Sequence, residues 1–225
     1  MQKELSRMGK RLNALLGRSS NASKLRTVAN LAVARIAILR NLHGVRCRQA
    51  RSDVIQLLHQ PHQQRALLRV EQVMKEENAL DALVMIEMCC HILGESTEII
   101  TNSRECPDEV KEAVSSLIFA ASRSGEFPEL QEIRRIFTSK YGKDFAYKAV
   151  ELRNECRVYP KLVEKLSTER ASSESRQIVL KQIAEDNGIA LEFIGGSRNM
   201  KDDGDAFDSD DAMSGLDIII ENPNV

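Results

Sequence analysis

The sequence predicts an all-α protein in which a long antiparallel helical hairpin carries several shorter packed helices. Aromatic residues make up only 4% of the 225 residues and Trp is absent, which is unusual for a β-sandwich or a ligand pocket. There are only 11 Gly and 5 Pro, so turns should be few and the elements long. Apolar residues also recur at helical spacing over two long stretches that a single proline separates.

The two long helices are expected over residues 24–60 and 63–102. The dipeptide Gln60-Pro61 ends the first one, because the residue before a proline is pushed out of the α region. At about 1.5 Å per residue, each helix would extend about 50 Å. A connection this short predicts that the second helix folds back antiparallel to the first. Gly94 is the only weak point expected within the second helix.

Shorter helices should follow the hairpin. Three of them open at a proline (Pro107, Pro128 and Pro160), a residue that suits the first turn of a helix. The expected helices span residues 107–122, 128–141, 143–152, 160–166 and 172–187. No stretch has the sustained alternation that would predict a sheet.

The two ends of the chain differ from this central part. Residues 3–16 have the spacing of a short basic amphipathic helix, and a break is expected over residues 17–23, which are rich in Ser, Asn and Gly. After Phe193, Gly, Asp and Ser dominate, as in a disordered segment. We therefore divide the chain into a basic amphipathic segment (1–23), a helical domain (24–193) and an acidic tail (194–225).

The formal net charge of −1 hides a strong polarity along the chain. Residues 1–69 carry 14 Lys and Arg against two acids, Glu4 and Asp53, and so have a charge of +12. Residues 71–197 carry 16 basic and 23 acidic residues, and residues 198–225 carry 2 and 8, which gives −7 and −6. A basic arm of this kind favours a phosphate-bearing partner, either a membrane surface or a nucleic acid.

The arginines of the first long helix fall into two stripes without any intervening acid between Glu4 and Asp53. A merely solvated helix mixes acids and bases at i,i+4, so we interpret this surface as functional. An anionic membrane fits better than single-stranded nucleic acid, because no aromatic residue precedes Phe119 to stack on bases. The alternative, a nucleic-acid-binding helical protein that uses the same basic arm, stays open. The predicted membrane-binding residues are Lys3, Arg7, Lys10, Arg11, Arg35, Arg40, Arg46, Arg48 and Arg51.

Catalytic, metal and cofactor sites are not expected. The five Cys show no pairing pattern, which favours a reducing compartment. Glu87 and His91 share a helix face at i,i+4, but no second pair repeats that metal spacing. Neither a phosphate-binding Gly-rich loop nor an activated nucleophile is recognisable. No apolar run is long enough to span a membrane, although the acid-free, Arg-rich start is also typical of transit peptides.

Several short sequence motifs resemble those of the increased-sodium-tolerance family of ESCRT-III-like proteins, which regulates the vacuolar-sorting AAA ATPase. These motifs occur in the same order over roughly residues 7–193, and many of them are unusual. They include Arg69-Val70-Glu71, Glu76-Glu77-Asn78, Leu80-Asp81, Glu105-Cys106-Pro107, Ser115-Ser116-Leu117-Ile118-Phe119-Ala120-Ala121, Pro128-Glu129-Leu130, Lys140-Tyr141-Gly142-Lys143, Cys156 and Lys165-Leu166-Ser167.

The resemblance implies a non-enzymatic adaptor and regulator in multivesicular-body protein sorting, located in the cytoplasm and peripherally on endosomal membrane. Its partners would be ESCRT-III subunits, the AAA ATPase or its cofactor, anionic membrane and further copies of itself. The acidic residues of the second long helix would serve partner binding or assembly, either exposed or paired with the basic first helix. They are Glu71, Glu76, Glu77 and Asp81.

The chain departs from the family pattern near residue 225. Family members carry short motifs that bind the microtubule-interacting-and-transport domain of the ATPase, one of them a leucine-rich helix with a central Arg-Leu. Here no Lys or Arg follows Lys201, so the basic version cannot form in this stretch. A divergent docking segment is the remaining expectation, and its residues are Leu216, Ile218, Ile219 and Ile220.

Overall fold

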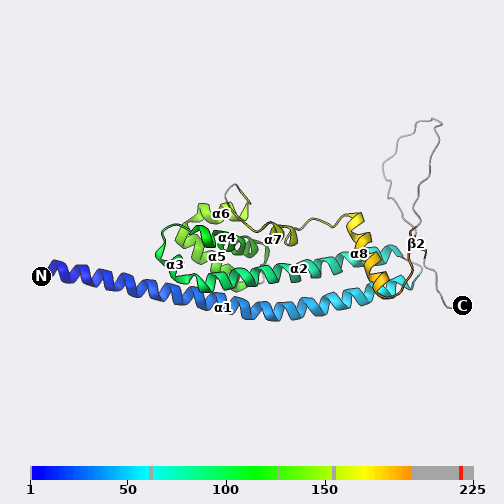
Figure 1. The fold of residues 1–225 in the computed structure, drawn as a ribbon, viewed down its shortest axis with the longest axis horizontal. Coiled ribbons are helices and arrows are strands. Elements are labelled where there is room, and N and C mark those ends of the chain that lie inside the picture. Colours follow the sequence, from blue (N-terminus) through cyan, green and yellow to red (C-terminus); the bar gives the residue numbers. More distant parts are fainter. Residues whose placement is uncertain (1, 61–62, 126, 154–155, 194–217, 220–225) are drawn as a thin grey trace, which may run out of the picture. The chain divides into compact units, whose positions relative to one another are not determined.

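The computed structural model describes residues 2–60, 63–125, 127–153, 156–193 and 218–219, with side chains for 21–60, 64–125, 127–153 and 156–191. The helices, in chain order, are α1 (Gln2–Leu58), α2 (Gln63–Glu95), α3 (Thr97–Asn102), α4 (Asp108–Arg123), α5 (Pro128–Tyr141), α6 (Lys143–Val150), α7 (Pro160–Lys165) and α8 (Ser173–Asp186) (Figure 1). The chain divides into two units, one of residues 1–44 and 77–168 and one of residues 45–76 and 169–225.

Helices α1 and α2 run antiparallel, as predicted. In the first unit, Arg40 of α1 pairs with Glu87 of α2, while Arg26, fourteen residues earlier on α1, bonds to the carbonyl of Gly94, seven residues later on α2. In the second unit, Arg69 of α2 bonds to Asp53 of α1. Residues later on α1 therefore pair with residues earlier on α2, which is the pattern of two antiparallel helices and confirms the predicted hairpin.

The predicted break over residues 17–23 is wrong, because α1 continues through it as a single helix. The reason is that Gly17 is the only strong helix breaker in this stretch, and one Gly costs a helix only about 1 kcal/mol relative to Ala. In the second long helix, the chain breaks at Ser96 rather than continuing to Asn102. Arg26 stabilises that break by donating to the Gly94 carbonyl and to Thr97 Oγ1.

The boundaries of the shorter helices follow local chemistry. Pro128 and Pro160 occupy the first turns of α5 and α7, as predicted. Gly142 ends α5 with φ of 93°, a conformation that suits glycine. The Ser172 hydroxyl caps α8 by accepting a hydrogen bond from the Ser175 N–H across 3.1 Å.

The core of the first unit centres on α4, which is buried on every side from Ala113 to Ala121. Helices α4, α5 and α6 contact one another, and Figure 1 shows them as one group. The largest fully buried side chains come from five helices of this unit, as expected for a single core. They are Leu25, Ile36, Ile86, Leu93, Ile100, Leu117, Ile118, Phe119, Leu130, Ile133 and Phe137.

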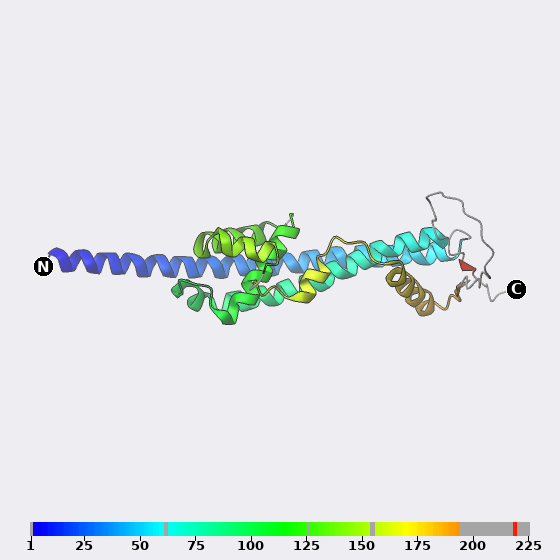
Figure 2. The same ribbon diagram turned by 90° about the horizontal axis from the view of Figure 1, so that it is seen from above.

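The second unit buries a narrower apolar seam. Its buried residues recur at three- and four-residue spacing on the last turns of α1, the first turns of α2 and one face of α8. They are Cys47, Ala50, Val54, Leu58, Ala66, Val70, Val73, Leu180, Ile183 and Ala184. Helix α8 lies beside this end of the hairpin in both views (Figures 1 and 2), and Arg51 reaches Asp186 at 3.9 Å.

A two-residue pairing follows α8, where no strand was expected. Strand β1 (Glu192–Phe193) pairs antiparallel with β2 (Ile218–Ile219), with Glu192 opposite Ile219. The predicted docking residues Ile218 and Ile219 therefore have strand backbone, while Leu216 and Ile220 lie outside the described residues.

Candidate partner-binding groove and charged faces

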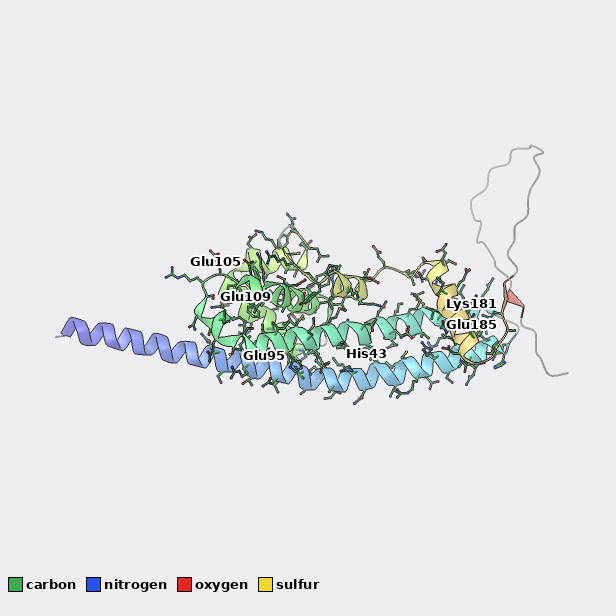
Figure 3. The ribbon with its side chains drawn as sticks, in the orientation of Figure 1. His43, Glu95, Glu105, Glu109, Lys181 and Glu185 are labelled. Atoms are coloured by element: carbon green, nitrogen blue, oxygen red, sulfur yellow. The ribbon has the colours of Figure 1, made fainter. Side chains whose placement is uncertain are left out.

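An apolar groove of about 270 Å³ opens in the first unit. Its floor is core: Leu83, Ile86 and Phe127 are at most 6% exposed. Its rim is half-buried and comes from Leu39 of α1, Ala79 of α2 and Leu166 at the end of α7. The remaining lining residues are His43, Ala82, Ser124 and Gly125, and Figure 3 labels His43 on α1.

The groove suits an apolar side chain presented by a partner. Its walls are mostly aliphatic or aromatic, and His43 and Ser124 supply polar groups within the lining. Gly125 stands at the turn between α4 and α5, and a Cβ built on it would meet nothing within 4 Å. The first atom of a side chain would therefore have open space at this residue of the lining.

The predicted basic residues are not equivalent in the structure. Arg35 bonds to Glu129 of α5, and Arg40 lies 3.0 Å from Glu87 of α2. Burial, the largest single effect, raises the pKa of Glu129, but the hydrogen bond and charge of Arg35 together with a backbone hydrogen bond lower it more, so the pKa lies below its usual value. Both arginines are thus partly neutralised within their unit.

The remaining predicted cations lie toward the ends of α1. Arg46 and Arg48 are exposed, whereas Arg51 is half-buried and reaches Asp186. Lys3, Arg7, Lys10 and Arg11 lie on the first turns of α1, and their side chains are outside the described residues.

An exposed apolar row on α1 escaped the sequence interpretation. Leu31, Ile38 and Leu42 are 53%, 67% and 42% exposed, and their spacing of seven and four residues places them on one face. A neighbouring row of the same helix, through Leu25, Ile36 and Leu39, is buried or half-buried. The sequence did contain a signal for this exposure. The first long helix carries two apolar rows, and packing against one antiparallel helix can bury only one of them.

Two of the predicted acidic residues of α2, Glu71 and Asp81, have ion-pair partners within their own units. Asp81 lies 2.9 Å from Lys165 of α7, and Glu71 lies 2.8 Å from Lys75 and 4.0 Å from Arg170. The hydrogen bond from Lys75 is the main reason why the pKa of Glu71 falls below its usual value. The other two differ in burial, because Glu76 is 5% exposed and accepts a bond from Gln72, while Glu77 is half-buried.

The cysteines have the character of core residues. Cys89 and Cys90 are at most 1% exposed, and burial raises the pKa of each thiol to about 12. A thiol with that pKa is almost entirely protonated near neutral pH and is a poor nucleophile. Glu87, which shares a helix face with His91, forms an ion pair with Arg40. Among the residues with described side chains, no group of three or more His, Cys, Asp or Glu could hold a metal ion.

Comparison with protein families identifies the chain. A model described as "Ist1: Regulator of Vps4 activity in the MVB pathway" matches residues 26–190, most of the described helical part. The chain belongs to the Ist1 family. This confirms the predicted family, and a family of regulators of another protein's activity agrees with the prediction of a non-enzymatic chain.

Two curated relatives belong to the same group. An IST1-like protein of Dictyostelium discoideum is 32% identical over 151 residues, which are 67% of this chain and 40% of that protein. The vacuolar protein sorting-associated protein IST1 of Saccharomyces cerevisiae is 24% identical over 169 residues, which are 72% of this chain and 56% of that protein. The Ist1-family region here thus spans about half the length of these relatives.

A solved structure confirms the predicted fold. The crystal structure of the S. cerevisiae Ist1 N-terminal domain in complex with the Did2 MIM motif aligns with a TM-score of 0.67 at 23% identity. The alignment covers 74% of this chain and 92% of that one. In the part of the chain that the structure describes, no helix combines the length and hydropathy needed to cross a bilayer.

Proposed function

We propose that this chain is an ESCRT-III-associated regulator in the multivesicular-body pathway, and that its apolar groove binds a helical motif of an ESCRT-III subunit. The groove carries the proposal. The family description supports the pathway, and the related Ist1 domain was solved with a Did2 MIM motif. Through such partners the chain would modulate the AAA ATPase from the cytoplasmic face of endosomes.

The groove's geometry supports a helix with spaced leucines as its occupant. Between the half-buried side chains of Leu39 and Leu166 lies a floor of Leu83, Ile86 and Phe127, which a single aliphatic side chain can cover. An amphipathic helix places such anchors at i, i+3 and i+4, the spacing that helix-in-groove recognition uses. Few anchors of this kind carry most of the binding energy in an interface.

A groove-filling variant tests the proposal without removing any core contact. Gly125→Leu adds a side chain where a Cβ has open space, at a residue without positive φ. We expect calorimetry with a synthetic Did2 MIM peptide to show binding that Gly125→Leu weakens about tenfold or more. Gly94→Leu is the matched control, because Gly94 is also open and lies outside the lining of the groove. Equal binding by both variants, or none by the unmodified chain, would overturn the proposal.

A second function, adsorption to acidic membrane, is favoured by the exposed row of Leu31, Ile38 and Leu42. Apolar side chains of a surface helix enter the headgroup region, and nearby cations are attracted to anionic lipid. The exposed Arg46 and Arg48 on the same helix supply such cations, together with the predicted Lys3, Arg7, Lys10 and Arg11.

A further inference from the structure

A second hollow in the first unit is basic rather than apolar. This basic cavity of about 350 Å³ is formed where α1, α3 and α5 meet. Its apolar floor includes the buried Leu25 and Ile100, with Ile136 half-buried beside them. The polar lining residues are Asn21, Lys24, Thr101, Arg135, Ser139 and Lys140.

The cations of the basic cavity outnumber the acid that faces them. Lys24 lies 3.0 Å from Glu132, and Arg135 donates to the same carboxylate from Nε and Nη2. A guanidinium has five N–H donors and an ammonium three, so Arg135 Nη1 and further Lys24 N–H groups can reach another acceptor. Lys140 adds a third cationic side chain to the lining of the basic cavity.

Lys140 is positioned toward the same hollow. Its ammonium donates to the Thr101 carbonyl across 3.3 Å and lies 5.4 Å from the centre of the Tyr141 ring. Ser139, which is exposed, precedes it on α5 and stands one turn after Arg135. The hydroxyl of Ser139 therefore lies on the helix face that carries the guanidinium.

The basic character continues into an adjoining, wider hollow of about 770 Å³. The two hollows share Arg135 and Ser139, and the second adds Arg134 and Lys143, with Glu151 as its acidic lining residue. The C-terminal half of α5 thus presents an edge that is positive on both sides of Ser139.

We propose that the basic cavity binds a phosphorylated polyol, a phosphate monoester on a six-membered ring of the inositol type. The three cationic side chains of the lining, Lys24, Arg135 and Lys140, suit the oxygens of a phosphate monoester, because charged donors make strong hydrogen bonds to phosphate. The amide of Asn21 and the hydroxyl of Ser139 can bond to ring hydroxyls, while Leu25, Ile100 and Ile136 face the apolar side of the ring. A hollow of this volume falls within the range of small-molecule sites, about 300–1,000 Å³, and exceeds what a bare phosphate fills.

The ligand can come from two sources, a lipid headgroup or a soluble inositol phosphate, and the test separates them. Soluble inositol trisphosphate and inorganic phosphate would be titrated by calorimetry at about 0.15 M salt. Vesicles that contain a phosphoinositide would be compared with phosphatidylserine vesicles of equal total charge. Preference for the phosphoinositide vesicles assigns the lipid source, and binding of only the soluble compound assigns the soluble one; both results support the proposal.

Two variants locate the binding. Ser139→Glu places a carboxylate beside Arg135 without removing an ion pair, and Lys140→Gln removes a cation should the first variant lower the melting temperature. Each should weaken binding of inositol trisphosphate about tenfold. Lys161→Gln, an exposed charge on α7 outside both hollows, should leave it unchanged.

Four results would overturn the proposal. They are no binding of inositol trisphosphate at this salt concentration, equal affinity for inorganic phosphate, tighter binding of a phosphopeptide, or no effect of either variant. None of these results depends on the apolar groove or on the exposed row of α1, so the basic cavity can fail while the proposed function holds.

Discussion

The backbone N–H of Tyr159 donates a hydrogen bond to the hydroxyl of Ser116, across 3.0 Å. Ser116 is fully buried on α4, and Tyr159 is the residue before Pro160, which opens α7. One hydroxyl in the core thus fixes the entry of a helix that is 43 residues away along the chain.

Adjacent serines allow this bond to be tested directly. Ser116→Ala leaves the N–H of Tyr159 without its partner and should lower the free energy of unfolding by about 1–2 kcal/mol. Ser115→Ala is the matched control, because the buried Ser115 hydroxyl has no hydrogen-bond partner and its loss should be neutral or stabilising. Urea unfolding of both variants measures the difference, and equal destabilisation would contradict this account.

Asp53 should give the second unit an acid-sensitive contribution to stability. Hydrogen bonds from Gln49 and then Arg69 lower its pKa from the usual 3.8. A lowered folded pKa stabilises the fold above the unfolded value and loses that contribution as the pH falls through the folded pKa. Asp53→Asn should therefore be less stable at pH 7 by about 0.5–1 kcal/mol, as for a partly exposed pair, and this gap should close below pH 3.8. Urea midpoints measured across this range would show it, and a gap that persists at low pH would count against it.

Membrane adsorption should depend on the exposed arginines more than on the paired ones. Replacing Arg46 and Arg48 by Gln removes about 1 kcal/mol each near an anionic surface, and so about tenfold or more in binding. Replacing Arg35 and Arg40 removes the same formal charge, but Glu129 and Glu87 already offset it. Vesicle flotation compares the two pairs at rising salt.

The same variants distinguish the membrane from nucleic acid. Equal binding to neutral vesicles would exclude electrostatic adsorption. Salt-dependent RNA binding with a sequence or structure preference would instead favour the nucleic-acid alternative that the basic arm left open.

The role of Asp81 in assembly can be separated from its bond to Lys165. Asp81→Lys breaks that bond and, if copies of the chain meet through this acid, also weakens self-association in sedimentation. Adding Lys165→Asp restores an opposite-charge pair between α2 and α7 but not the original charge of α2. Recovery of self-association in the double variant would assign Asp81 a purely internal role. Glu77→Lys extends the test, whereas Glu76 is too buried for a clean charge reversal.

The predicted docking segment of the tail, Leu216 and Ile218 to Ile220, can be tested for direct binding to the ATPase. Calorimetry with the purified microtubule-interacting-and-transport domain of the ATPase should show binding that is lost when residues 197–225 are removed, if Leu216 and Ile218 to Ile220 dock there. Binding that survives the removal would assign the contact to the helical part. No binding by either form would mean that regulation passes through partner subunits.

Sequence reasoning reached the fold because strong local signals agreed with the packing. Pro128 and Pro160 open α5 and α7 as predicted, and α1 and α2 end and begin on either side of the predicted boundary at residues 60–61. It failed where the local signal was weak, as at Gly17 inside α1, and where a long-range bond decides the outcome, as with Arg26 at the break near Ser96.

The candidate sites were harder to predict than the fold. The groove floor consists of core residues such as Leu83 and Ile86, and the fact that one side of them stays open emerges only from packing. Likewise, the pairing of Arg35 with Glu129 joins residues 94 positions apart, a distance at which composition and periodicity carry no information. Charge counts therefore located the basic arm but could not separate its paired arginines from its exposed ones.

The buried thiols can serve as chemical probes of local opening of the fold. Cys89 and Cys90 belong to the first unit and Cys47 to the second, and all three are shielded from solvent. A thiol reagent can modify them only when their surroundings open, so modification rates report opening free energies in the manner of amide exchange. Cys156, which is only partly buried, would react earlier and calibrate the reagent. The modification rates would thus show whether the two units open together or separately, and whether a bound partner slows the opening of one of them.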